Sequence, residues 1–248
     1  VEELARSAAE QALAKLGGQS IESKDYPVIL RNNVAADLLR TYSSIFSGEE
    51  AAKGLSLLQG RIGQQVTGAN ITIVDDPFYE NGPGSAPFDA EGVATAAHEV
   101  IKRGELLTFL HNRKSAAKAG VESTGNAVKS SYRAAVTIAP TNLYIEPGDA
   151  SLAELIAGTE RGILIVELQG MHAGTNTVSG DFSLFCIGHL IENGKVTRPV
   201  NQITVSGNFL KLLGDVEALG NDLRFSGFDR DASGSPSLKV KSLAIAGK

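Results

Sequence analysis

The sequence is poor in the features that mark secreted and membrane-spanning proteins. It has a single cysteine, Cys186, so no internal disulfide can form, which fits a reducing compartment. Its longest apolar runs, such as Ile163–Val166, are far shorter than the roughly 20 residues that a membrane-spanning helix needs. No basic segment followed by an apolar one opens the chain, as a secretion signal would. We therefore expect a cytoplasmic protein that is not inserted in a membrane.

Histidine and clustered basic residues are also scarce. The histidines are too far apart for the paired ligands of a helical zinc site. They are His98, His111, His172 and His189. Lysine and arginine are scattered through a chain of net charge −5, whereas duplex DNA binding needs several clustered phosphate contacts. We expect no zinc site built on these histidines and no direct nucleic-acid binding.

One short motif is compatible with catalysis. Ser115 and Lys118 match the Ser-x-x-Lys pattern, in which a lysine activates a serine on a helix. The companion Ser-Asp-Asn and Lys-Thr-Gly motifs of that class are absent, as are a Walker loop and a Gly-x-Gly-x-x-Gly turn. A pattern with two fixed positions often arises by chance, so a serine hydrolase stays an alternative only.

Apolar spacing predicts helices in the first part of the chain. Residues 1–18 form an amphipathic pattern that ends at Gly17-Gly18, as a helix C-terminus does. Because this helix opens the chain without a methionine, we expect a fragment or a processed chain. A second helix is predicted from Asn33, as its N-cap, to Ile45. A third is predicted over Glu49–Gln59, with a break at Gly54.

The rest of the chain favours strands joined by hairpins. Asn193-Gly194, between two alternating segments, is the strongest short hairpin signal, and Arg103-Gly104 resembles it. Strands are predicted at Asn70–Val74, Val93–Asn112 (a pair), Ala134–Ala139, Leu143–Glu146, Gly162–Leu168, Phe182–Ile191, Lys195–Val205 and Leu238–Ala246. Helices are predicted at Asn112–Ala119, Ser151–Ala157 and Asn208–Leu219. The pattern indicates an α+β domain with a largely antiparallel β-sheet and several flanking helices.

The segment Gly170–Phe182, GMHAGTNTVSGDF, is dense in glycine and small polar residues and follows an apolar strand. Glycines allow a close approach of the backbone. His172, Thr175, Asn176 and Asp181 offer donors and acceptors to an extended peptide. Functional residues concentrate on loops of this kind. Two interpretations stay open: a solvated surface loop, and a segment that contacts a peptide or a partner.

Five stretches of the sequence resemble the TldD/PmbA family, and together they cover nearly the whole chain. They are Gly170–Asn208, Pro87–Thr95 (PFDAEGVAT), Ser123–Ala127 (STGNA), Thr141–Ser151 (TNLYIEPGDAS) and Pro236–Gly247 (PSLKVKSLAIAG). A long match in order is more specific than any short motif above. The resemblance implies the fold of the family's C-terminal domain. It also implies a separate N-terminal domain, which residues 1–18 would join as a leading helix.

The resemblance is to the TldE (PmbA)-like kind of subunit. TldD-like chains hold zinc with a His-Glu-x-x-x-His motif and a distant cysteine, and the glutamate is the general base. The corresponding positions here are Arg40, Thr41 and Ile45, and Phe228–Ser235, where the cysteine is expected, has none. Arginine offers only donors and a fixed positive charge, and isoleucine offers no ligand atom. The resemblance thus implies no catalytic residue and no metal in this chain.

A heterodimer with a TldD-like subunit, which would hold the zinc, is the partnership that the resemblance implies. The complex would be a cytoplasmic peptidase acting on unfolded peptides, such as microcin precursors. The family is also linked by name to modulation of DNA gyrase, and the acidic composition suggests an indirect link. Three alternatives stay open: a stand-alone peptide-binding or regulatory protein, a hydrolase with an unrecognised site, and a homodimer of the isolated chain.

Overall fold

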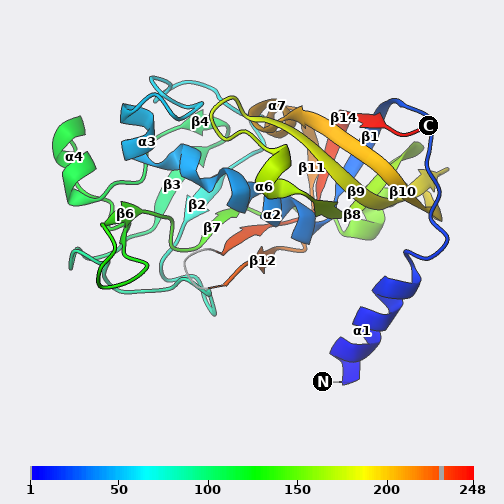
Figure 1. Cartoon of the computed structure of the whole chain (residues 1–248), viewed down its shortest axis with the longest axis horizontal. Coiled ribbons are helices and arrows are strands. Elements are labelled where there is room, and N and C mark those ends of the chain that lie inside the picture. Colours follow the sequence, from blue (N-terminus) through cyan, green and yellow to red (C-terminus); the bar gives the residue numbers. More distant parts are fainter. Residues whose placement is uncertain (1, 229–231) are drawn as a thin grey trace.

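Two six-stranded sheets organise the computed structural model, which describes residues 2–228 and 232–248 (Figure 1). The larger sheet contains, in spatial order, β1 (Lys24–Leu30), β8 (Arg161–Gln169), β9 (Asp181–Glu192), β10 (Lys195–Asn208), β14 (Leu238–Ala246) and β11 (Val216–Leu219). β1 pairs in parallel with β8 and antiparallel with β14, so five of these strands close on themselves. All other pairings in this sheet are antiparallel.

The second sheet is built from short strands. In spatial order they are β12 (Arg224–Ser226), β13 (Ser233–Ser235), β7 (Leu143–Ile145), β2 (Ile73–Asp75), β3 (His98–Lys102) and β4 (Glu105–Leu106). Among the described residues of this sheet, β13 and β7 form the one parallel pair. A separate two-stranded sheet joins β5 (Ala127–Val128) and β6 (Thr137–Ile138). The predicted α+β class, with a largely antiparallel sheet, is confirmed.

Short helices flank these sheets. They are α1 (Glu2–Leu13), α2 (Asn32–Tyr42), the 3-10 helix η1 (Ser43–Phe46), α3 (Gly48–Ala52), α4 (Arg113–Ala119), α5 (Leu152–Ala157), α6 (Met171–Gly174) and α7 (Phe209–Gly214). α2 packs against β8, β12 and β13, whereas α1 extends away from the body of the molecule (Figure 1). Leu13 and Leu16, beside the predicted stop at Gly17, are 65% and 68% exposed. Within the described ranges, no helix is long and apolar enough to cross a membrane.

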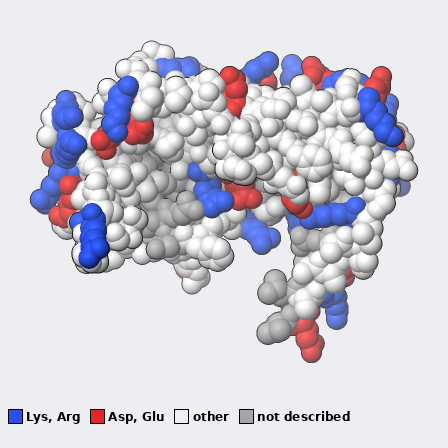
Figure 2. Space-filling model, viewed as in Figure 1, with Lys and Arg blue, Asp and Glu red and all other residues white. Residues whose placement is uncertain are grey.

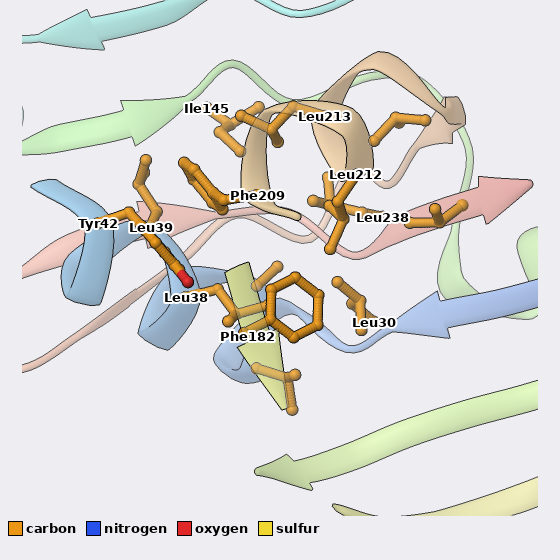
Figure 3. Close-up of a cluster of buried hydrophobic side chains, with 14 of the residues drawn as sticks. Leu30, Leu38, Leu39, Tyr42, Ile145, Phe182, Phe209, Leu212, Leu213 and Leu238 are labelled. Carbon is orange, nitrogen blue, oxygen red and sulfur yellow. The ribbon is translucent and has the colours of Figure 1, made fainter. Parts of the chain in front are cut away.

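The main hydrophobic core surrounds α2 and lies between the two sheets. Within it, the rings of Tyr42 and Phe209 stack with centroids 4.5 Å apart and planes at 8° (Figure 3). A smaller cluster of buried residues contains Ile29, Leu164 and Leu155 of α5. β8 contributes to both clusters, so its two faces are covered by different parts of the molecule.

The two predicted hairpin turns, Asn193-Gly194 and Arg103-Gly104, are confirmed. Asn193 and Gly194 have φ values of 52° and 69°, and Arg103 and Gly104 have φ values of 46° and 84°. Two successive positive φ values fit the primed turns that suit the twist of a hairpin. Ser151, the first residue of the predicted helix Ser151–Ala157, is the N-cap of α5, and its hydroxyl accepts the N–H of Glu154. Local chemistry is sufficient to place these features.

Three predicted helix boundaries are wrong. Arg31, not Asn33, is the N-cap of α2, and the Asn33 amide instead donates to the Val166 carbonyl at 3.1 Å. The helix predicted over Glu49–Gln59 ends at Ala52, because Gly54 takes a left-handed conformation that closes α3 and no helix follows. The helix predicted over Asn208–Leu219 divides into α7 and β11, because residues 216–219 pair with β14.

Strand β1 has no counterpart in the prediction. It contains Pro27, which cannot donate a hydrogen bond and which argues against a central strand. The pairing with β14 shifts register between Tyr26 and Val28, so an irregularity accommodates the proline. β1 nevertheless completes the closed sheet, since Val28 and Leu30 are buried in the main core.

Candidate functional site

The three positions that correspond to the zinc motif lie on α2 and the 3-10 helix after it. Arg40 and Thr41 are half-buried on the last turn of α2, and Ile45 is fully buried in η1. The Arg40 guanidinium lies 3.8 Å from the carboxylate of Asp37, one turn earlier. Ser226 of β12 donates to the same carboxylate at 2.6 Å. This end of α2 is therefore tied to the neighbouring strand by side-chain contacts.

The described end of the interval in which a family cysteine was expected lies beside α2. It contains β13, and both β13 and the preceding β12 pack against α2. Asp229, Arg230 and Asp231 lie outside the described residues, whereas Ser233 and Ser235 are buried. The fold thus brings together the two parts of the chain that the resemblance assigned to one site.

Cys186 cannot replace the missing thiolate. It lies in β9, inside the main core, and burial raises the pKa of its thiol to about 12. A metal ligand must be deprotonated, which this environment disfavours. Across the described ranges, no group of three His, Cys, Asp or Glu side chains is arranged to hold a metal ion.

The segment 170–181 packs directly on the end of α2 that carries Arg40 and Thr41. These two positions and Ile45 are called the degenerate motif below. Thr41 donates its hydroxyl to the Asp37 carbonyl at 2.8 Å, and the same oxygen lies 3.2 Å from the sulfur of Met171. The Tyr42 hydroxyl donates to the carbonyl of Asp181 at 2.9 Å. Burial and the nearby Asp181 carboxylate raise the pKa of Tyr42 to about 12, so this hydroxyl stays a donor. Both ends of the segment are therefore fixed to α2.

Within the segment, three of the four predicted contact residues hold the turn in shape. Thr175 donates to the Met171 carbonyl at 2.6 Å. The Asn176 side chain accepts the N–H groups of Val178 and Ser179 at 2.9 and 3.1 Å. These bonds use the side-chain oxygens that sequence reasoning had offered to a peptide.

Asp181 and His172 complete the set of four. The Asp181 carboxylate accepts hydrogen bonds from Asn208 and Ser179, which lower its pKa. His172, in α6, is exposed, and no side-chain hydrogen bond joins it to another described residue. His172 is thus the one side chain of the four that stays fully available to a partner or a peptide.

The surroundings of Ser115 bear on the serine-hydrolase alternative. Ser115 is buried near the start of α4, where its hydroxyl and the Asn112 side chain form a reciprocal capping box. The same hydroxyl lies 3.0 Å from Nδ1 of His111, and burial lowers the pKa of that ring. Lys118 lies on the last turn of α4, and none of its hydrogen bonds or ion pairs reaches Ser115. Helix capping explains Ser115 without a catalytic role.

Comparisons with known proteins agree with this geometry. Residues 23–247 match the family described as the PmbA/TldA metallopeptidase C-terminal domain. A metalloprotease PmbA homolog of Buchnera aphidicola is 29% identical over 89% of this chain and 47% of its own length. A metalloprotease TldD homolog of Haemophilus influenzae is 30% identical over 98% of this chain and 52% of its own length. The chain thus spans about half the length of the curated relatives it matches.

Solved structures show the same architecture. A protein from Thermotoga maritima, described as a modulator of a DNA gyrase, superposes with a TM-score of 0.92 and 42% identity. TldE from Thermococcus kodakarensis superposes with a TM-score of 0.91 and 27% identity. In both cases the match covers 99% of this chain and 55% of the other. PmbA-type and TldD-type relatives match almost equally well, so overall identity does not assign the chain to either type.

Proposed function

The chain belongs to the PmbA/TldD metallopeptidase family through its C-terminal domain, and from that membership we propose that it is a TldE-like, non-catalytic subunit. In this proposal a TldD-like partner holds the zinc, and this chain supplies structure and part of the surface of the substrate cavity. The complex is a cytoplasmic peptidase acting on unfolded peptides such as microcin precursors. Residues 1–18 are the helix that leads from an N-terminal domain.

The state of the three motif positions is the observation that carries the proposal. Ile45 is completely buried in the main core, so its position serves packing. The Thr41 hydroxyl is engaged by the Asp37 carbonyl and Met171, and Arg40 lies beside the Asp37 carboxylate. A zinc site needs several deprotonated ligand atoms around an open position. Among the described residues, these contacts leave no such set at this end of α2.

The segment 170–181 supports the second part of the proposal. It covers the degenerate motif, and its internal hydrogen bonds hold the exposed His172 on a structured turn. In the proposed heterodimer this turn faces the partner or the peptide near the partner's zinc. Contact through the backbone would give affinity with little dependence on peptide sequence, which suits a peptidase that acts on unfolded chains.

Reconstitution with a TldD-like chain tests the proposal. Each subunit is purified, desalted, analysed for zinc, and assayed for peptide cleavage alone and together, with and without a chelator. We expect less than a tenth of a zinc ion per molecule in this chain and chelator-sensitive cleavage only with the partner. One zinc per molecule of this chain would contradict the proposal. Cleavage by this chain alone that survives the chelator would favour the serine alternative.

A further inference from the structure

A pocket of about 420 Å³ lies beneath α1, on the side of the large sheet that carries the smaller hydrophobic cluster. Its floor comes from three neighbouring strands, through Leu164, Val166, His189 and Val196. Leu152 of α5 and the end of the α1 segment form its walls. The volume is within the range of small-molecule sites, roughly 300 to 1,000 Å³.

The basic side chains of this pocket differ in how they are paired. Lys15 forms an ion pair with Glu167, which also accepts a hydrogen bond from Gln169. Arg31 and His189 line the same pocket, and neither has a side-chain hydrogen bond or ion pair with another described residue. Figure 2 shows basic side chains in the hollow where α1 leaves the body of the molecule. Both side chains are half-buried, so the pocket offers them as hydrogen-bond donors to a ligand.

The local electrostatics favour a negatively charged group. Burial is the largest cause of the lowered pKa of His189, and the positive charges of Lys15 and Arg31 lower it further. Among the described side chains that line the pocket, Glu10 of α1 is the one acidic group, and it is exposed. A carboxylate placed between Arg31 and His189 would accept charge-assisted hydrogen bonds, which are stronger than neutral ones.

The rest of the lining is apolar. Val196 is 45% exposed and lines the same pocket as Leu164 and Val166, with His189 on the strand between them. Covering this surface with hydrocarbon contributes roughly 25 cal/mol per Å² of apolar area removed from water. The pocket thus combines two side chains that can bind an anion, Arg31 and His189, with an aliphatic surface.

We propose that this pocket binds an aliphatic carboxylate, held at its charged end by Arg31 and His189 and along its chain by Leu164, Val166 and Val196. The C-terminal residue of a peptide and a free fatty acid both carry this chemistry. The site is separate from the corner that holds the degenerate motif, because Arg31 and Thr41 lie ten residues apart, about 15 Å along α2. It does not depend on a partner subunit.

Calorimetric titration of the whole chain tests the proposal with two carboxylates, octanoate and N-acetyl-Leu-Leu. The uncharged controls are octanamide and N-acetyl-Leu-Leu-amide. We expect each binding carboxylate to exceed its amide at least tenfold in affinity, because hydrogen bonds to an ionised acceptor are stronger than those to a neutral one. Binding of octanoate alone identifies a lipid-derived acid, and binding of the dipeptide alone identifies a peptide C-terminus.

Three variants sharpen the test. Arg31→Gln should weaken binding at least tenfold, and Glu10→Gln should strengthen it about twofold or more by removing like charge. Arg113→Gln, at an exposed position on α4, is the matched control and should leave binding unchanged. Thermal unfolding of each variant checks that the fold is kept. The proposal is overturned if neither carboxylate binds below 10 mM, if the amides bind equally well, or if Arg31→Gln binds like Arg113→Gln.

Discussion

The two ends of α2 differ in what their polar side chains contact. At the C-terminal end, Thr41 and Tyr42 bond to α2 itself and to the segment 170–181. At the N-terminal end, Arg31 and the nearby His189 face a pocket and have no described partner. Sequence composition drew attention to the first region and not to the second. Polar composition alone therefore does not show which side chains are already held by contacts within the fold.

The largest effect on stability is expected from the replacement of Tyr42, at the C-terminal end of α2. Tyr42→Ala removes a fully buried ring that stacks on Phe209, so we expect the free energy of unfolding to fall by about 3–5 kcal/mol. Tyr42→Phe keeps the ring and loses only the hydrogen bond to Asp181, for a cost of about 1 kcal/mol. Urea unfolding measures both. Equal losses for the two variants would show that packing at this corner is weak.

A change at Ile45 tests whether the motif position could be repaired. Ile45→His places a polar ring in a fully buried apolar site, and we expect a loss of about 3 kcal/mol or more. Ile62→His is the matched control, since Ile62 is 57% exposed and its replacement should change stability by less than about 0.5 kcal/mol. Urea unfolding again gives the comparison. A stable Ile45→His protein would mean that this end of α2 can be opened to a ligand.

Asn176 and His172 lie in the same segment, 170–181, but differ in role. The Asn176 side chain holds the turn in shape, whereas the His172 side chain is available to a partner or a peptide. Asn176→Ala leaves the N–H groups of Val178 and Ser179 without their acceptor, so we expect a loss of about 1 kcal/mol in unfolding free energy. His172→Ala should cost less than about 0.5 kcal/mol, because the ring is exposed. In the reconstituted complex, His172→Ala should nevertheless slow cleavage or weaken assembly. Unchanged cleavage and assembly would identify the segment as a solvated loop.

The smallest expected effect concerns His189, which lies near Arg31 at the N-terminal end of α2. Its lowered pKa means that the unfolded chain binds the proton first as the pH falls, so stability declines below the ordinary pKa near 6.5 and levels off below the folded-state pKa. Arg31→Gln removes one cause of the shift and should raise the pKa of His189, which reduces this pH dependence. An NMR titration of the ring measures the pKa, with Arg113→Gln as the control. A pKa that does not change in Arg31→Gln would show that Arg31 does not act on the ring.

Much of the local structure could be predicted from the sequence, because it depends on residues close together in the chain. Asn193-Gly194 takes the positive φ values of a hairpin turn, and Ser151 caps α5 through Glu154. The errors occur where contacts between segments far apart in the chain determine the secondary structure. Residues 216–219 look helical alone but pair with β14, and β1 is stabilised by β8 and β14 despite Pro27.

The sequence by itself determined the family pattern and the residues that stand at the motif positions, Arg40, Thr41 and Ile45, because these are matters of chemical identity. It could not show that Thr175, Asn176 and Asp181 would bond within their own turn, since those partners are chosen by the folded backbone. It also gave no signal for the pocket beneath α1. Arg31, Leu164 and His189 lie far apart in the chain, and only the pairing of β1, β8 and β9 brings them to one surface.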